Sequence, residues 1–241
     1  NKLWVTDHAN HAPRSVPLDT ATPSSSRGEP IGVEEAFHTH HFSVLDKDGN
    51  RVAATLSIIL PFGSGFVAPG TGVLLNNEMD DFSAKPGSPN AYGLVGSQAN
   101  AIAPGKRPLS SMTPTFVEFD DRVAILGTPG GSRIITMVLL GILETLAGSD
   151  ATTIVSRPRY HHHYLPDAVY FEPGALSEAE MAALRGRGFT LKSAGREYGN
   201  FHAVIWNRSA NTLDAAADPR GIGEAAVRSS SAEKVLGAAA D

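Results

Sequence analysis

The alternation of hydrophobic and polar positions between residues 37 and 60 predicts a β-hairpin. β-Branched and aromatic residues lie on both sides of Asp46–Asn50, and Gly49 within that segment can adopt a positive φ. Antiparallel pairing around this turn can bring Ser57 on the second strand opposite Thr39 on the first. Two hydroxyl side chains are therefore expected to face each other.

Two helices are predicted further along the chain. Residues Ser132–Ala147 are apolar almost all round, with Ser132 as the N-cap and Gly148 as the C-terminal stop. This helix is expected to be buried. A shorter helix begins at Ser177, which matches a capping box with Glu180 three residues later.

Strand patterns and one long loop complete the predicted elements. The further strands are Gly72–Leu75, the hairpin pair Thr113–Phe119 and Arg122–Gly127, and Phe201–Trp206. Residues 84–107 carry Pro and Gly at short intervals, which indicates a long ordered loop of the kind that often serves as a lid. Strands and helices in this order, with hairpin connections, indicate an α+β fold of stacked layers.

The two ends of the chain differ from its middle. Residues 1–38 show little periodicity and contain a Ser-rich run among prolines, so we predict a linker or tail there. Residues 221–241 are rich in Ala and Ser and are expected to form a flexible C-terminal tail. A single domain over residues 39–220 remains between them.

Composition narrows the class of protein. The 241 residues are 41% hydrophobic, with a formal charge of -5 and a pI near 6.0, which argues against nucleic acid or an anionic membrane as the main partner. The absence of cysteine excludes disulfides, thiol catalysis and Cys-based metal sites. There is no run of about 18 apolar residues, as a membrane span would need. The chain begins with Asn1 and shows no leader, so we expect a piece of a longer precursor.

Residues Thr39–Asn50 read Thr-His-His-Phe-Ser-Val-Leu-Asp-Lys-Asp-Gly-Asn. This stretch resembles the start of the small subunit of γ-glutamyltranspeptidases, also called glutathione hydrolases. The similarity continues through Leu74–Ser83, Pro89–Val95, Lys106–Met112, Gly127–Arg133, Pro158–His162, Leu165–Asp167 and Asp218–Arg220. It is nearly continuous from Thr39 to about Arg220.

The resemblance implies a four-layer αββα sandwich of the N-terminal nucleophile hydrolase type, of which this chain supplies the small-subunit half. Residues 1–38 would then be the tail of the large-subunit part, and the large subunit would be the partner in a heterodimer. Family members are usually exported, which implies a periplasmic or extracellular location. No cofactor is implied.

Thr39 is the candidate nucleophile. A hydroxyl needs a base within hydrogen-bond reach, and cleavage between His38 and Thr39 would create an α-amine of pKa near 8 that can act as that base. In the resembling family the precursor cleaves itself at this point, and the matching Thr forms a γ-glutamyl-enzyme. Ser57 matches a family Thr that supports the nucleophile. Without the resemblance, a Thr at the start of a strand is usually structural.

Glu78 and Asp81 are the candidate ligands for a substrate ammonium group, since a carboxylate is the simplest selective device for one. Asp81 matches the family residue with that role, and Glu78 matches a position that contributes to it. The alternative is an acidic turn at the surface. Leu74–Leu75 and Met79, which flank the pair, predict partial burial.

Gly130 and Gly131 directly precede the apolar helix. Glycines let the backbone approach a ligand closely, and N–H groups at a helix N-terminus favour negative charge. An oxyanion hole needs both features, and the family's oxyanion donors match these glycines. A tight turn is the alternative interpretation.

The rest of the substrate pocket rests on the resemblance. Ser110 and Ser111 match two hydroxyl residues that hold the substrate α-carboxylate, while no residue of this chain matches the Arg that completes that clamp from the large subunit. Tyr92 matches an aromatic lid residue, which would favour transfer to an amino-acid or peptide acceptor over hydrolysis.

The expected function is γ-glutamyl transfer from, or hydrolysis of, glutathione and related γ-glutamyl amides. Two departures keep alternatives open: His40 replaces a family Thr, and Ile59 replaces an Asn that contacts the substrate amino group. The alternatives are a cephalosporin (glutaryl) acylase of the same family and an unprocessed, non-catalytic remnant. The histidine runs at residues 38–41 and 161–163 lack zinc-site spacing, so no metal is expected.

Overall fold

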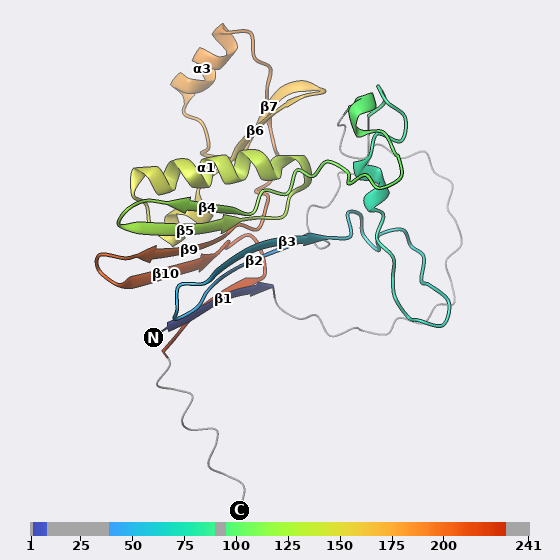
Figure 1. Cartoon of the computed structure of the whole chain (residues 1–241). Coiled ribbons are helices and arrows are strands. Elements are labelled where there is room, and N and C mark those ends of the chain that lie inside the picture. Colours follow the sequence, from blue (N-terminus) through green and yellow to red (C-terminus); the bar gives the residue numbers. More distant parts are fainter. Residues whose placement is uncertain (1, 9–38, 90–94, 230–241) are drawn as a thin grey trace, which may run out of the picture.

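The computed structural model describes residues 2–8, 39–89 and 95–229. Within these ranges the chain forms two four-stranded sheets and one three-stranded sheet, together with three α-helices and three 3-10 turns (Figure 1). The mixed α and β content predicted from the sequence is confirmed.

The first sheet has the strand order β11-β1-β2-β3. Strands β2 (Thr39–Leu45) and β3 (Arg51–Ser57) are the predicted hairpin. The Asp46 carboxylate closes its turn, accepting the backbone N–H groups of Asp48 at 2.8 Å and Asn50 at 2.9 Å. The register places Thr39 opposite Ser57, as the sequence predicts.

The two chain ends contribute strands that the sequence analysis did not predict. Strand β1 (Lys2–His8) lies within the expected linker, and β11 (Gly223–Ser229) lies within the expected tail. The two pair antiparallel over seven residues, and β1 also pairs with β2. The surrounding Pro-, Ser- and Ala-rich sequence hid both strands, each of which pairs with a segment distant in the chain.

The second sheet has the order β10-β9-β5-β4. Strands β4 (Thr115–Glu118) and β5 (Arg122–Gly127) form the second predicted hairpin, and β9 (His202–Asn207) matches the strand predicted from residue 201. Strand β10 (Thr212–Ala217) completes it. Residues 123–127 of β5 are all buried, because one face of the sheet contacts the first sheet and the other contacts helices.

Helices α1 (Ile134–Ala147) and α2 (Ala151–Ser156) cover the outer face of the second sheet. In Figure 1, α1 lies over β4 and β5, so that the molecule has an α-β-β order of layers. Gly141 allows close packing, since a Cβ there would come within 2.6 Å of the Phe201 ring.

Two expectations for the apolar helix need correction. A 3-10 turn, η3 (Gly131–Arg133), precedes α1, and Ser132 makes no cap. The helix is buried on one face only: its exposed apolar side chains are Ile135, Leu139, Leu143 and Leu146. Its end at Gly148, with φ 87°, is as predicted.

A third sheet and a helix lie beyond α1. Strands β6 (Tyr160–Tyr164), β7 (Asp167–Phe171) and β8 (Leu191–Ser193) form the sheet. Helix α3 (Glu178–Gly186) has the predicted capping box at Ser177. No helix in the described ranges is long and apolar enough to cross a membrane.

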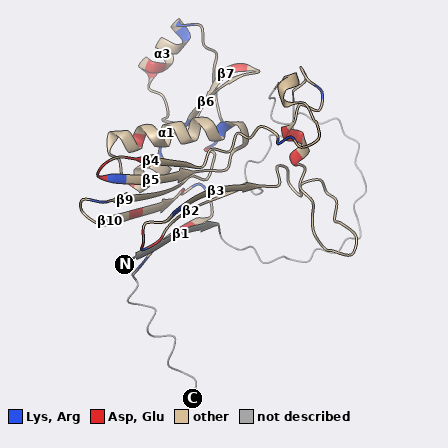
Figure 2. Ribbon diagram, viewed as in Figure 1, with Lys and Arg blue, Asp and Glu red and all other residues tan. Residues whose placement is uncertain are grey.

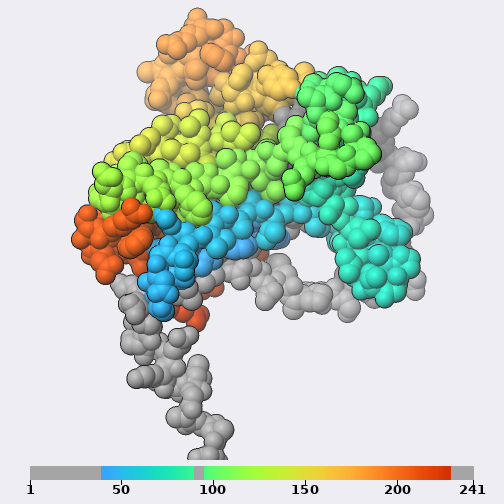
Figure 3. All heavy atoms as spheres, viewed as in Figure 1, coloured from blue at the N-terminus to red at the C-terminus, as the bar shows by residue number. Residues whose placement is uncertain are grey.

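Residues 58–76 leave the hairpin and project from the end of the sheets as a lobe, visible in Figure 3. The strand predicted at Gly72–Leu75 is wrong: the segment forms one isolated bridge, between Val67 and Leu74, and its apolar side chains are exposed. In Figure 2, the acidic and basic residues are scattered over several elements and are not gathered on one of them.

Candidate active site

Thr39 and Ser57 meet at the end of the hairpin that is remote from its turn. Thr39 is the first residue of β2 and Ser57 is the last residue of β3. Their hydroxyl oxygens lie 2.8 Å apart. The Ser57 oxygen also accepts the backbone N–H of Ile59 at 2.8 Å. Because the Ser57 oxygen is the acceptor in this bond, its hydroxyl proton remains available for donation to Thr39.

Ile59 has an unusual backbone conformation directly beside this pair. Its φ is 66° and its side chain is only 7% exposed. A β-branched residue rarely adopts the left-handed region, because its Cβ crowds the backbone. Sequence reasoning identified Ile59 as a departure from the family but gave no signal of this conformation.

Glu78 and Asp81 lie on the short 3-10 turn η1 (Glu78–Asp81). Asn77 fixes the start of the turn by accepting the Leu60 N–H through its side chain at 3.0 Å, and Asn100 fixes the end by donating to the Asp81 carbonyl at 2.7 Å. These bonds hold η1 against the exit of β3. Both carboxylates are therefore near Ser57 although about twenty residues separate them in the sequence.

The acidic pair has perturbed protonation. Burial, and then the neighbouring Asp81 carboxylate, raises the pKa of Glu78 to about 7. Burial also raises the pKa of Asp81, while its hydrogen bond with Glu78 acts in the opposite direction. The expected source of burial is wrong, however: Leu74, Leu75 and Met79 are exposed.

Gly130 and Gly131 form the turn between β5 and α1. Gly130 has φ 143° and Gly131 has φ 55°, and a Cβ at Gly130 would come within 2.4 Å of the Met137 methyl group. Only glycine suits the first position without repacking. The Gly131 carbonyl accepts the Ser111 hydroxyl at 3.2 Å, which links the serine pair to this turn.

One small pocket collects most of the predicted site residues. Its lining is Thr39, Ser57, Ile59, Glu78, Asp81, Ser110, Ser111, Met112, Gly131 and Ile134. Gly130, which directly precedes Gly131, does not line the pocket. His38 and Tyr92 lie outside the described residues, so the cleavage point and the lid stay predictions. Met112 and Ile134 were not predicted, since nothing in their local sequence marks them.

His41 is a buried residue of β2 close to Thr39. It lies two residues after Thr39 on the same face of β2, is 1% exposed, and bonds Thr55 at 2.9 Å and Ser43 at 3.0 Å through its two ring nitrogens. Burial, and then His202, lowers its pKa to about 3. His41 is therefore a neutral structural residue that packs β2 onto β5.

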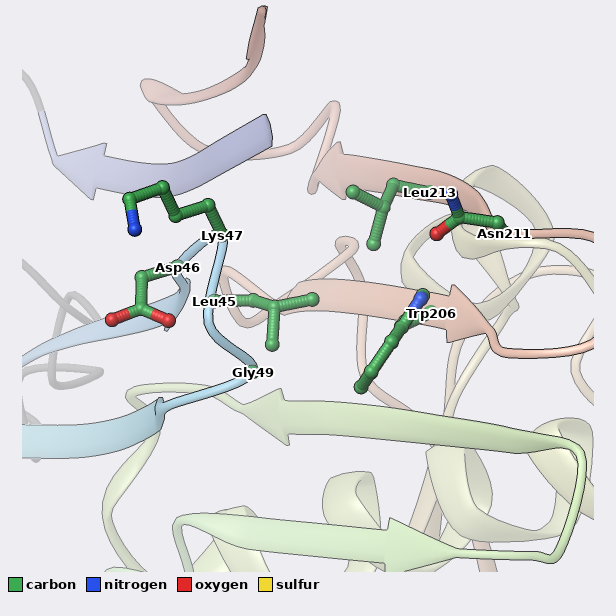
Figure 4. A pocket seen from close by; sticks show the side chains of 7 residues that line it. All are labelled: Leu45, Asp46, Lys47, Gly49, Trp206, Asn211 and Leu213. Carbon is green, nitrogen blue, oxygen red and sulfur yellow. The ribbon is translucent and has the colours of Figure 1, made fainter. Parts of the chain in front are cut away.

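A second hollow lies at the other end of the hairpin (Figure 4). Leu45 and Leu213 point into it beside Trp206. The nearby charged groups are engaged in the hairpin turn: Lys47 pairs with Asp48 at 2.8 Å, and Asp46 accepts backbone N–H groups. This hollow is therefore not a candidate catalytic site. Among residues 2–8, 39–89 and 95–229, no group of three or more His, Cys, Asp or Glu side chains is placed to hold a metal ion.

Comparison with known proteins assigns the family. The model of the family described as gamma-glutamyltranspeptidase matches residues 2–228. The chain belongs to the γ-glutamyltranspeptidase family. The resemblance carried by Thr39–Asn50 and the later segments is thereby confirmed.

Family members of known sequence and structure agree. The chain is 43% identical to the glutathione hydrolase proenzyme of Escherichia coli over 86% of this chain and 36% of that protein. It is 46% identical to the proenzyme of Pseudomonas aeruginosa over 78% and 34%. The T380A mutant of Helicobacter pylori gamma-glutamyltranspeptidase superimposes with a TM-score of 0.68 and 42% identity, over 75% of this chain and 98% of that one. The chain thus spans about a third of the length of these curated relatives.

Proposed function

We propose that the protein transfers or hydrolyses the γ-glutamyl group of glutathione and other γ-glutamyl amides, with Thr39 as the nucleophile. The observation that carries this proposal is the 2.8 Å contact between the Thr39 and Ser57 hydroxyls in a pocket that Glu78, Asp81 and the serine pair also line. The names of the relatives, glutathione hydrolase proenzymes, support it.

The first half of the reaction forms an ester. Cleavage before Thr39 frees an α-amine, which takes the hydroxyl proton as the oxygen attacks the γ-carbonyl carbon. Ser57 donates a hydrogen bond to Thr39, and N–H groups of the Gly130–Gly131 turn stabilise the oxyanion of the tetrahedral intermediate. The amide C–N bond then breaks, and the leaving amine takes the proton from the α-ammonium group.

The second half returns the enzyme to its starting state. Water, or the amine of an amino acid or peptide, attacks the ester carbonyl and passes a proton through the same α-amine. Glutamate or a new γ-glutamyl amide leaves as the Thr39 oxygen is reprotonated. Glu78 and Asp81 hold the substrate ammonium group throughout, and Ser110 and Ser111 hold its carboxylate.

The proposal extends to the architecture of the whole protein. We infer a fourth layer, giving the αββα sandwich of N-terminal nucleophile hydrolases, and a heterodimer with a large subunit from the same precursor. The outward face of the first sheet supports this inference, because Val52 and Leu56 on it are 45% and 57% exposed and apolar surface of this kind calls for a cover. Export to the periplasm or the cell exterior is likewise a proposal, by analogy with the family.

Intact-mass analysis of the protein as the cell makes it, beside its Thr39→Ala variant, tests the mechanism. We expect a fragment that begins at Thr39 in the first and an uncut chain in the second. An uncut chain in both would leave Thr39 without its amine base. The non-catalytic alternative, a chain that only associates with a partner subunit, would then take the place of the enzyme.

Glutaryl transfer is a second candidate function, favoured by one observation. Ile59 contributes buried apolar surface to the pocket, whereas a pocket dedicated to an ammonium group would carry a polar side chain there. γ-Glutamyl and glutaryl anilides separate the two functions, because the glutaryl group lacks the ammonium. We expect faster turnover of the γ-glutamyl anilide, and the reverse order would support the acylase.

A further inference from the structure

The two acidic residues of the pocket are close neighbours. Glu78 and Asp81 are three residues apart on η1, and the carboxyl group of each influences the pKa of the other. Glu78 Oε1 is buried and makes no hydrogen bond within the described part of the chain. Both side chains line the pocket that contains Thr39.

The side chains that this chain contributes to the lining of the pocket do not compensate for two negative charges. Among the described residues that line the pocket, none is Lys, Arg or His. The next acidic residue, Asp80, further raises the pKa of Asp81 by repulsion. Two carboxyl groups that share a partly buried site cannot both ionise easily, because each loses hydration and repels the other.

We propose that the Glu78–Asp81 pair holds one proton when the pocket is empty and releases it when a substrate ammonium group binds. The pair would then act as a proton-coupled selectivity filter: fully ionised, it favours donors with an ammonium group strongly, and singly protonated, with half the charge, it favours them less. This inference rests on the proposed function, since it concerns how the same site chooses its donor.

The charge balance of binding is simple. The empty pair carries one negative charge and one proton shared between the two carboxyl groups. An arriving ammonium group brings a positive charge, which makes the second ionisation favourable, and the proton passes to solvent. The bound state contains two carboxylates and one ammonium, so binding is opposed by a high proton concentration.

The direction of the pH dependence follows from this balance. The pKa of Glu78 is raised to about 7, so below that pH the empty pair is protonated and an ammonium donor must displace the proton. Above it, the proton is already absent and binding no longer depends on pH. Preference for ammonium donors therefore rises with pH up to about 7 and is constant beyond.

The ratio of the kcat/KM values for two donor substrates, one with and one without an ammonium group, isolates this effect. The value of kcat/KM for a γ-glutamyl anilide is divided by the value for the glutaryl anilide, from about pH 5.5 to about pH 8.5. Both donors use Thr39, its amine and the same oxyanion donors, so titration of those groups cancels in the ratio. We expect the ratio to rise about tenfold or more and then level off.

Matched variants assign the effect to the pair. In Glu78→Gln the side chain keeps its shape but does not titrate, and we expect a ratio that is flat with pH. Asp80→Asn removes one charge from the same turn outside the pocket, and we expect it to keep the pH-dependent rise with a slightly lower midpoint. Equal profiles in the wild type and Glu78→Gln would overturn the proposal.

Calorimetry gives an independent readout. Binding of glutamate is measured near pH 7 in two buffers of different ionisation enthalpy. The difference gives the number of protons released, which we expect to be a substantial fraction of one in the wild type and near zero in Glu78→Gln. No release in the wild type would contradict the inference, while absence of turnover with either anilide would instead contradict the proposed function.

Discussion

Ile59 combines a buried, β-branched apolar side chain with a left-handed backbone conformation that such residues rarely adopt. Its backbone has φ 66°, which costs a non-glycine residue about 1–2 kcal/mol, and a branched Cβ makes the conformation less favourable still. The N–H of this strained residue nevertheless reaches Ser57 at 2.8 Å. The strain is therefore tied to the position of the hydroxyl that contacts Thr39.

Replacing Ile59 with Asn tests its role in donor choice. Asn tolerates the left-handed region, and its amide oxygen can accept a hydrogen bond from a substrate ammonium, worth roughly 1.5–3 kcal/mol. We expect the preference for γ-glutamyl over glutaryl anilide to rise at least about tenfold. The measurement is the ratio of the two kcat/KM values. Ile58→Asn, one residue outside the pocket, serves as the control, and an equal change in both variants would refute the assignment.

At the residue scale, the sequence predicted which residues lie together better than it predicted their conformation. The pairing of Thr39 with Ser57 follows from strand spacing and turn length, both of which are local. The φ of Ile59 and the burial of Glu78 depend on Asn77 and Asn100, which act on η1 from outside it. Such contacts have no local pattern, so sequence reasoning attributed the burial to the wrong neighbours.

At the level of elements, strand β5 approaches β2 especially closely at Gly127. Gly127 ends β5, and a Cβ there would come within 2.1 Å of the His41 ring. His41 in turn lies two residues from Thr39 on the same face of β2. The absence of a side chain at Gly127 thus sets how near the first sheet, which carries Thr39, lies to the turn that carries Gly130 and Gly131.

Gly127→Ala is expected to force these sheets apart. Overpacking of this kind costs about 1–3 kcal/mol, and we expect a lower urea midpoint together with reduced activity. Gly186→Ala is the matched control: a Cβ added at this helical glycine would meet nothing within 4 Å, and Ala there is expected to stabilise the protein by up to about 1 kcal/mol. A Gly127→Ala variant as stable as the wild type would show that the sheets can adjust.

Elements with a strong local pattern were predicted well, and those that rely on partners were not. The two hairpins, α1 and the capping box of α3 each follow from turn residues, caps or periodicity. Strands β1 and β11 gave no such signal, because each pairs with strands that are distant in the sequence. The exposed side of α1 was mistaken for buried, since an apolar pattern does not say which face has a neighbour.

At the scale of the whole molecule, a buried cluster of charges joins the third sheet to the second. Arg159 pairs with Asp218, and Arg220 pairs with both Asp218 and Glu172 at 3.1 Å. Asp218 also accepts the backbone N–H of Phe201 at 2.8 Å. Because these residues are spread over about sixty positions, the sequence shows only scattered charges where the fold has one network.

Removal of Asp218 should therefore be costly. Asp218→Ala leaves buried Arg159, whose side chain is 3% exposed, without its carboxylate, and we expect a loss of about 3–5 kcal/mol in the free energy of unfolding. Asp48→Ala removes an exposed pair with Lys47 and is expected to leave the free energy of unfolding nearly unchanged, because solvent screens such pairs. Chemical denaturation of both variants measures the difference, and similar losses would argue against the network.

The strand order β11-β1-β2-β3 has a consequence for what happens after cleavage. A cut before Thr39 would place β1 on one polypeptide and both of its neighbours, β2 and β11, on the other. The strand would then be clamped between two strands of the other product, and its departure would open two sheet edges at once. Backbone cleavage would thus release an amine without releasing a fragment. The two products would remain held together by the strand pairs on both sides of β1.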